Sequence, residues 1–265
     1  MSLFRQNLHQ GGWFSFNAPV GLWQESYAIK MYQTFFGDRG THLLFGAPNV
    51  NEELLCTSNL PINLLDGKRC LVVGGGPSSF HLNDEIYDSY DVVVVCNHFF
   101  KNEYLKAKKA NIVLLGDEVN LKDEKLLEYL AVFKPAVGFE HSGRRSSRQF
   151  INFIQGYKSS FIYLTRYFSR LGYVARGCAL ARCLGAHSVD FIGMDGFNKQ
   201  KTKHYFEKDK QPPPFSDEKM FKQQAEVFFR YMYFDLGLKQ FSNLGEKYEE
   251  SIYSGLLEEV KNEEG

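Results

Sequence analysis

The stretch from Cys70 to Asn97 constrains the fold more than any other part of the chain. It contains two apolar runs that are expected to be strands, residues 70–73 and 92–96, and a glycine-rich turn at 74–79 follows the first of them. Strands buried on both faces of a parallel sheet have continuous apolar runs of this kind, and glycines after the first strand let the backbone approach a phosphate. The stretch therefore predicts the first two strands of an α/β sheet that binds a nucleotide or a nucleotide-activated donor.

Beyond this stretch, short apolar runs alternate with segments of helical spacing. Further strands are expected at 111–115, 135–139, 160–164, 188–193 and 239–243, and helices at 102–108, 122–133, 148–155, 174–184 and 217–234. Residues 78–87 are expected to form a helix or an irregular turn, and the acidic tail a helix. Strands that alternate with helices imply right-handed crossovers. The sequence thus predicts an α/β, Rossmann-like fold with a mostly parallel sheet and helices on both faces.

The chain divides into two regions by composition. Residues 1–66 contain both tryptophans and one segment of helical spacing at 22–36. We expect them to form an N-terminal appendage on a nucleotide-binding transferase domain at 67–265; alternatively, they are the tail of a preceding unit. Residues 199–214 are polar, basic and end in three prolines. Because ligands of open α/β sheets bind beyond the carboxyl ends of strands, this loop after the strand at 188–193 is expected to be a lid.

Composition excludes some classes of partner. The chain has 31 Lys and Arg and 31 Asp and Glu, so no net charge attracts nucleic acid. The five cysteines include no CxxC pair and are expected to be reduced thiols packed as small apolar residues. No apolar stretch is long enough to span a membrane, and no signal peptide is expected. A cytoplasmic protein is therefore predicted, and the sequence leaves open peripheral membrane contact and homo-oligomerisation.

The candidate ligand-binding residues follow strands. The glycine-rich turn consists of Gly74, Gly75, Gly76, Pro77, Ser78 and Ser79. It matches neither the Gly-x-Gly-x-x-Gly nor the Walker pattern, and its amides and hydroxyls are expected to face phosphate or ribose, the alternative being a tight turn without a ligand. Asn97 and Asp195 each end a strand, where the amide can bond a base or ribose and the carboxylate can hold ribose, acceptor or lid. Both residue types are also common in turns.

Two charged clusters lie in other loops. Asp117 and Glu118 follow the strand at 111–115, and a pair of carboxylates can bind Mg²⁺. We favour a structural role for them, because no Asp-x-Asp motif occurs elsewhere, and we predict no metal site. Arg144, Arg145 and Arg148 lie in a hydroxylated loop, where their guanidinium groups can clamp a carboxylate or phosphate of a substrate. The alternative is a solvated loop.

The order of these motifs resembles that of the bacterial CMP-sialic-acid-dependent sialyltransferases of the Campylobacter and Haemophilus lipooligosaccharide type. It is also similar to a wider group that includes motility-accessory-factor and hydroxymethylpterin-diphosphokinase-like proteins. The likeness covers residues 68–245. The matching residues are Gly74, Gly76, Pro77 and Ser78; Cys96 and Asn97; Leu184 and Gly185; and Gly193 and Asp195.

The resemblance implies a metal-independent glycosyltransferase that needs no cofactor. Its substrates would be a nucleotide-sugar donor, carrying an acidic CMP-activated sugar, and a glycan acceptor, as in the biosynthesis of bacterial surface polysaccharide. In that family the glycine turn and the asparagine hold the CMP moiety, which here implies residues 74–78 and Asn97. A lid histidine is the catalytic base, which here implies His204. Independently of the resemblance, the leaving phosphate needs its charge neutralised, and Tyr205 or a nearby lysine such as Lys203 can face it.

The chain departs from the family's pattern at two places. The family's base is a second lid histidine, and Glu207 stands near that place here, so the base is either His204 or Glu207. The family's Thr-Ser-Gly-like turn, which touches the donor, is replaced by Leu, Gly and Tyr at 171–173. The identity of the donor sugar therefore stays open.

Two other functions are compatible with the same sequence. A diphosphokinase-like enzyme would hold Mg²⁺ at Asp117 or Asp195, and a dependence on metal would distinguish it. A non-catalytic nucleotide-binding or assembly module would use the tryptophan-containing residues 1–66 to contact a partner. Such a module would bind nucleotide without turnover.

Overall fold

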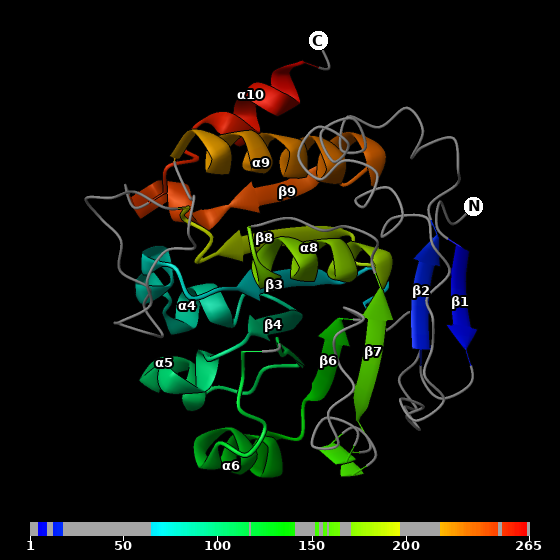
Figure 1. Cartoon of the computed structure of the whole chain (residues 1–265). Coiled ribbons are helices and arrows are strands. Elements are labelled where there is room, and N and C mark those ends of the chain that lie inside the picture. The colour runs from blue at the N-terminus through cyan, green and yellow to red at the C-terminus, as the bar shows by residue number, and fades with distance from the viewer. Residues whose placement is uncertain are drawn as a thin grey trace.

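A computed structural model describes residues 5–9, 13–17, 65–116, 118–140, 152–153, 156–157, 159–164, 171–196, 218–248 and 251–263. Its centre is a nine-stranded sheet with the order β1-β2-β7-β6-β5-β4-β3-β8-β9. The strands are β1 (Arg5–His9), β2 (Trp13–Asn17), β3 (Arg69–Val73), β4 (Val92–Cys96), β5 (Ile112–Leu114), β6 (Ala136–Glu140), β7 (Ser160–Leu164), β8 (Ser188–Ile192) and β9 (Gln240–Asn243). Figure 1 shows the strong twist of this sheet.

All neighbouring strands from β2 to β9 pair in parallel, and only β1 runs antiparallel to its neighbour β2. The α/β class with a mostly parallel sheet is therefore confirmed. The pairing of β2 with β7 was not expected, since residues 1–66 were predicted to form an appendage. The boundary at residue 66, the helix at 22–36 and the lid at 199–214 stay predictions, because the residues that would show them lie outside the described ranges.

The helices lie close to their predicted positions. They are α4 (Asp84–Tyr87), α5 (Glu103–Lys106), α6 (Glu124–Phe133), α8 (Tyr173–Cys183), α9 (Glu218–Arg230) and α10 (Leu256–Asn262), with 3-10 helices at Pro77–His81, Phe99–Lys101 and Leu244–Tyr248. The segment at 78–87 splits in two, because Pro77 opens a 3-10 helix and Asn83 then caps α4 by accepting the Ile86 N–H. The long helix predicted to 234 ends at Arg230 and continues as the π-helix Tyr231–Asp235.

Helices cover both faces of the sheet. Alternate side chains of β3 point to opposite faces, as the two-residue period of a strand requires. Cys70 and Val72 pack in a core with α8, α9 and α10, whereas Leu71 and Val73 pack in a second core with α4, α5 and α6. Helix α8 lies in front of the sheet in Figure 1, and its Gly177 allows this close approach, since a Cβ there would lie 2.9 Å from Val72 Cγ1.

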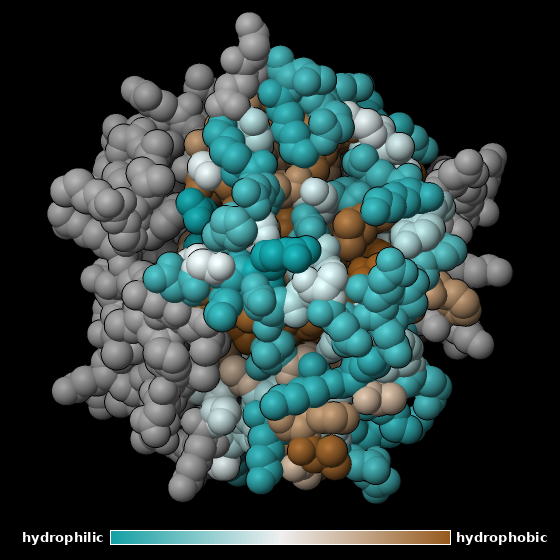
Figure 2. Space-filling view, turned by 180° about the vertical axis from the view of Figure 1, so that it is seen from behind, coloured by the Kyte–Doolittle hydropathy of each residue, from teal (hydrophilic) through white to brown (hydrophobic). Residues whose placement is uncertain are grey.

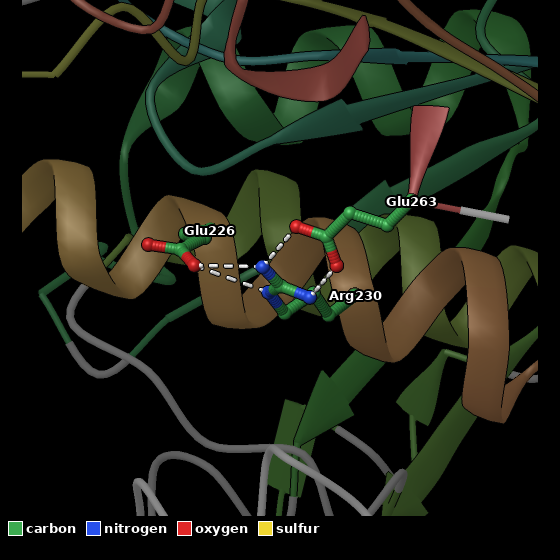
Figure 3. A network of polar contacts seen from close by, with 3 residues as sticks. All are labelled: Glu226, Arg230 and Glu263. Carbon is green, nitrogen blue, oxygen red and sulfur yellow. Dashed lines mark hydrogen bonds and ion pairs between the residues drawn. The ribbon is translucent and has the colours of Figure 1, made fainter. Parts of the chain in front are cut away.

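Helix α10 is fixed to α9 by a network of charged groups. The guanidinium of Arg230 lies between the carboxylates of Glu226 and Glu263 (Figure 3) and donates two hydrogen bonds to each of them. The bonds to Glu226 measure 3.1 and 3.0 Å. Glu263 directly follows α10, so this network holds the end of the described chain against the α9 layer.

The side of the molecule turned away from α8 is mostly hydrophilic, with hydrophobic residues visible between the polar ones (Figure 2). The large apolar side chains exposed within the described ranges are Phe80, Leu127, Val132 and Phe234. Among the helices described, none is long and apolar enough to cross a bilayer.

Candidate functional site

The order of the strands places a candidate site at the carboxyl end of β3. After β3 the chain adds β4, β5, β6 and β7 in succession on one side, and then β8 and β9 on the other side. Open α/β sheets bind ligands outside the carboxyl ends of the strands, at the point where the direction of strand addition reverses. The turn after β3, Asn97 after β4, Gly116 after β5 and Asp195 after β8 all belong to this edge.

The glycine turn is packed directly against the end of β8. The Gly74 N–H donates to Ile192 O and the Gly76 N–H to Gly193 O, both at 2.8 Å. A Cβ at Gly74 would lie 2.6 Å from Gly193 O and still closer to Val174 Cγ2. Gly193 itself has φ +80°, a conformation that residues with a Cβ rarely adopt. The glycines at 74 and 193 therefore allow two strand ends and α8 to meet.

The two serines of the turn direct their hydroxyls into the protein. Ser78 is fully buried, its Oγ accepts the Gly193 N–H at 2.9 Å, and its own N–H donates to Asp195 Oδ2 at 2.8 Å. The Ser79 hydroxyl donates to Gly76 O at 2.7 Å. Within the described chain, the partly exposed Gly75 is the one residue of the turn whose N–H has no protein acceptor. A phosphate that reaches this turn would therefore meet Gly75, while ligand contacts of the serine hydroxyls stay an untested prediction.

Asp195 connects three segments of the chain. Besides its bond to Ser78, its backbone oxygen accepts the Ile252 N–H at 2.9 Å. A Cβ at Gly245, in the 3-10 helix after β9, would lie 2.8 Å from Asp195 Oδ1. The side chain is 3% exposed. In this structure Asp195 is a buried connector, and its predicted contact with a nucleotide is not tested.

Asn97 has a strained backbone and an ordered side chain. It directly follows β4 with φ 52°, in the left-handed region that few non-glycine residues occupy and that is enriched at functional sites. Its Oδ1 accepts the Gly116 N–H at 2.7 Å, and its Nδ2 donates to Glu118 Oε1 at 2.6 Å. Asn97 thereby joins the ends of β4 and β5. Its side chain is partly exposed, and Nδ2 has a second proton to donate.

The N-terminus of α8 reaches the same place. Tyr173 begins the helix after Gly172 (φ +84°), a residue with no side chain to cap the helix, and the first turn has no acidic residue. A Cβ at Gly116 would lie 2.8 Å from Tyr173 Cε2, and Val174 touches Gly74, so the helix begins opposite the end of β4. The guanidinium of Arg176 lies over the Tyr173 ring at 5.1 Å. The backbone N–H groups at the start of a helix and the helix dipole favour an anion here.

The four cysteines that the structure describes are buried apart from this site. Cys70, Cys96, Cys178 and Cys183 are free and buried, which confirms the prediction of packed thiols for these four; Cys56 lies outside the described residues. Burial raises the pKa of each thiol, to about 12 for Cys183. Such thiols are protonated at neutral pH and are poor nucleophiles.

Several predicted site residues lie outside the described ranges. They are His204, Tyr205, Glu207, Arg144, Arg145, Arg148 and Asp117. Conversely, the sequence pattern suggests for Glu118 only a place in a carboxylate pair that could bind Mg²⁺, and it suggests no ligand role for the start of α8. The available signals are a position in the turn after a strand for Glu118 and a position directly after a glycine for Tyr173. Among the described residues, no three His, Cys, Asp or Glu side chains gather as a metal site would require.

Comparison with known proteins adds little to this picture. No protein-family model matches the sequence, and no curated protein matches it. Among solved structures, the MAf glycosyltransferase from Magnetospirillum magneticum AMB-1 is similar, with 14% sequence identity and a TM-score of 0.39. The match covers 93% of this chain and 46% of that protein, so the chain spans about half its length. At this TM-score the likeness carries no argument, and the α/β class follows from the strand order itself.

Proposed function

We propose that the protein is a glycosyltransferase that takes a sugar from a nucleotide-activated donor. The observation that supports the proposal is the convergence of Asn97 and the N-terminus of α8 at the carboxyl edge of a parallel sheet, beside the point where the strand order reverses. The N-terminus would bind the phosphate through backbone N–H groups and the helix dipole. The second N–H of the Asn97 amide would bind the nucleoside. The order of the sequence motifs supports cytidine as the base and an acidic sugar as the group transferred.

The proposed reaction needs a base and a stabilised leaving group. The acceptor hydroxyl attacks the anomeric carbon of the donor sugar, the bond from that carbon to the phosphate oxygen breaks, and its electron pair leaves with CMP. The hydroxyl proton passes to the imidazole of His204, whose ordinary pKa of about 6.5 suits a base at neutral pH. The charge that develops on the phosphate is stabilised by α8, so the proposal requires no metal ion.

A thermal-shift panel tests the class of ligand. We expect CMP to stabilise the protein more than UDP, GDP, ADP or ATP, with or without Mg²⁺ and in the presence of EDTA. A ligand at one hundred times its Kd adds about 2.7 kcal/mol to the free energy of unfolding, which is easily detected. Stabilisation by ATP with Mg²⁺ alone would favour the diphosphokinase alternative. Nucleotide binding without turnover in a product assay would favour the non-catalytic module.

Replacement of His204 tests the mechanism. We expect His204→Ala to lower kcat by about 10²- to 10⁴-fold while donor affinity changes little, because a positioned base acts in the transition state. The acidic limb of the pH profile of kcat/KM should disappear as well. His187→Ala is the matched control, since His187 is exposed and directly precedes β8 at the opposite edge of the sheet. Normal turnover by His204→Ala would exclude this base and leave Glu207 as the next candidate.

A further inference from the structure

The carboxylate of Glu118 lies at the ligand side of the Asn97 amide. Its Oε1 accepts a hydrogen bond from Asn97 Nδ2 at 2.6 Å, and Oε2 lies over Gly116, so that the carboxylate would have to move if Gly116 carried a Cβ. Gly116 thus provides the space that the carboxylate occupies. The Glu118 side chain is exposed although its position is fixed by this hydrogen bond.

Glu118 retains most of its capacity to accept hydrogen bonds. An ionised carboxylate has about four acceptor positions, and Asn97 fills one of them. Across the described ranges, no Lys, Arg or His forms an ion pair with Glu118, and the first-turn N–H groups of α8 do not donate to it. An exposed carboxylate held in one orientation without a cation is suited to accept hydrogen bonds from a ligand.

The site has two charged features, the N-terminus of α8 and the Glu118 carboxylate, and they favour different groups of a ligand. The N-terminus of α8 attracts an anionic group, whereas the Glu118 carboxylate repels one. Next to Glu118, the remaining Nδ2 proton of Asn97 is a donor, so donor and acceptor stand side by side. A hydroxyl both donates and accepts, and it therefore fits this pair better than a phosphate or an ammonium group.

We infer that Glu118 binds the ribose hydroxyls of the nucleotide and makes the site selective for ribonucleotides. The inference rests on the proposed function, which supplies the nucleotide. The 2′-hydroxyl donates a hydrogen bond to the carboxylate of Glu118 and accepts one from the amide of Asn97. A deoxyribonucleotide leaves both groups without their partner, which costs binding energy.

Calorimetric titration with CMP and 2′-deoxy-CMP tests this role. The wild-type protein is expected to bind CMP about 10- to 100-fold more tightly than 2′-deoxy-CMP, the range for a hydrogen bond to a charged group. In Glu118→Gln and Glu118→Ala the preference is expected to fall below about threefold, mainly through weaker CMP binding. Glu128→Gln, an exposed residue on α6 away from this edge, is the control and keeps the wild-type preference.

The outcomes separate three cases. If CMP binds the wild-type protein and the preference survives in Glu118→Gln, Glu118 does not contact the ribose. Equal losses for both nucleotides in Glu118→Ala, with none in Glu118→Gln, would mean that Glu118 only orients Asn97, and would also overturn the inference. If neither nucleotide binds the wild-type protein, the proposed function itself is contradicted. Circular dichroism of each variant confirms that it is folded.

Discussion

The carboxyl edge of the sheet has two halves that differ in how their polar groups are used. At the junction of β3 and β8, the Gly74, Gly76 and Ser78 N–H groups and the Ser78 hydroxyl all bond to the end of β8. At the ends of β4 and β5, Asn97 and Glu118 bond to each other and still have donors and acceptors to spare. We call these the closed half and the open half.

The difference shows that packing alone can require the glycines of such a turn, whether or not the turn also binds a ligand. In the closed half the glycines are required because backbone and helix approach within contact distance, and the serine hydroxyls stabilise that approach. In the open half the side chains of Asn97 and Glu118 have surplus hydrogen-bonding capacity, and the N-terminus of α8 lies opposite them. Mutations in the closed half should therefore affect stability, and those in the open half should affect binding.

The largest effect is expected for Gly74→Ala. Its Cβ would lie 2.6 Å from Gly193 O and would overlap Val174, so strand ends or α8 must move. Overpacking of this kind destabilises by about 3 kcal/mol, measured as the free energy of unfolding in urea. Gly156→Ala is the control, since nothing lies within 4 Å of its Cβ position. Equal stability of the two variants would mean that the closed half is less tightly packed than described.

A loss of binding without a loss of fold is expected for Asn97. Asn97→Gly removes the side-chain amide and introduces a residue that readily adopts φ 52°. We expect the free energy of nucleotide binding to weaken by about 1–3 kcal/mol. Asn97→Ala should lose the same affinity and also some stability, because alanine is strained in this conformation. Asn120→Ala, whose side chain caps an exposed turn, serves as the comparison. Unchanged affinity in titration calorimetry would reduce Asn97 to a turn residue.

Ser78→Ala should show the reverse pattern. The substitution leaves the buried Gly193 N–H without its acceptor, which costs about 1–3 kcal/mol of stability. Nucleotide affinity should stay at the wild-type value, because the hydroxyl faces β8. Ser89→Ala removes an exposed hydroxyl and is expected to be neutral within about 0.5 kcal/mol. A loss of nucleotide affinity in Ser78→Ala without a loss of stability would mean that the Ser78 hydroxyl contacts the nucleotide.

The smallest expected effect is a pH dependence at Glu246, in the 3-10 helix that packs beside the closed half through Gly245. Burial raises the pKa of the Glu246 carboxyl, although hydrogen bonds with Gly255 and Asn243 partly oppose this. A raised pKa in the folded state means that Glu246 favours folding below its unfolded pKa and loses this contribution as the pH rises through the folded pKa. Thermal unfolding should therefore show Glu246→Gln gaining stability relative to wild type as the pH rises from about 4 toward neutrality. A difference that does not vary with pH would contradict this.

Sequence patterns predicted the fold better than the site. The strands at Val92–Cys96 and Ser160–Leu164 were predicted to the residue, because each is an apolar run with polar boundaries. β1 was not predicted, because Arg5–His9 has no apolar run. It is a strand because it pairs with β2. The inward direction of the Ser78 hydroxyl depends on a partner 115 residues away. No local pattern encodes such a contact, nor the bond that joins Asn97 to Glu118 across 21 residues.

The contact between Ser78 and Asp195 also has a consequence for how the chain matures during synthesis. The two residues are 117 positions apart, so the turn emerges from the ribosome long before its acceptor does. Because synthesis adds about 5–20 residues per second, the N–H groups of the turn lack their acceptors at β8 for roughly 6–23 seconds. During that interval β3 has an unpaired edge, which is a known route to aggregation. A nascent chain stalled before β8 should therefore be a strong substrate for chaperones, and one stalled beyond Asp195 a weak one.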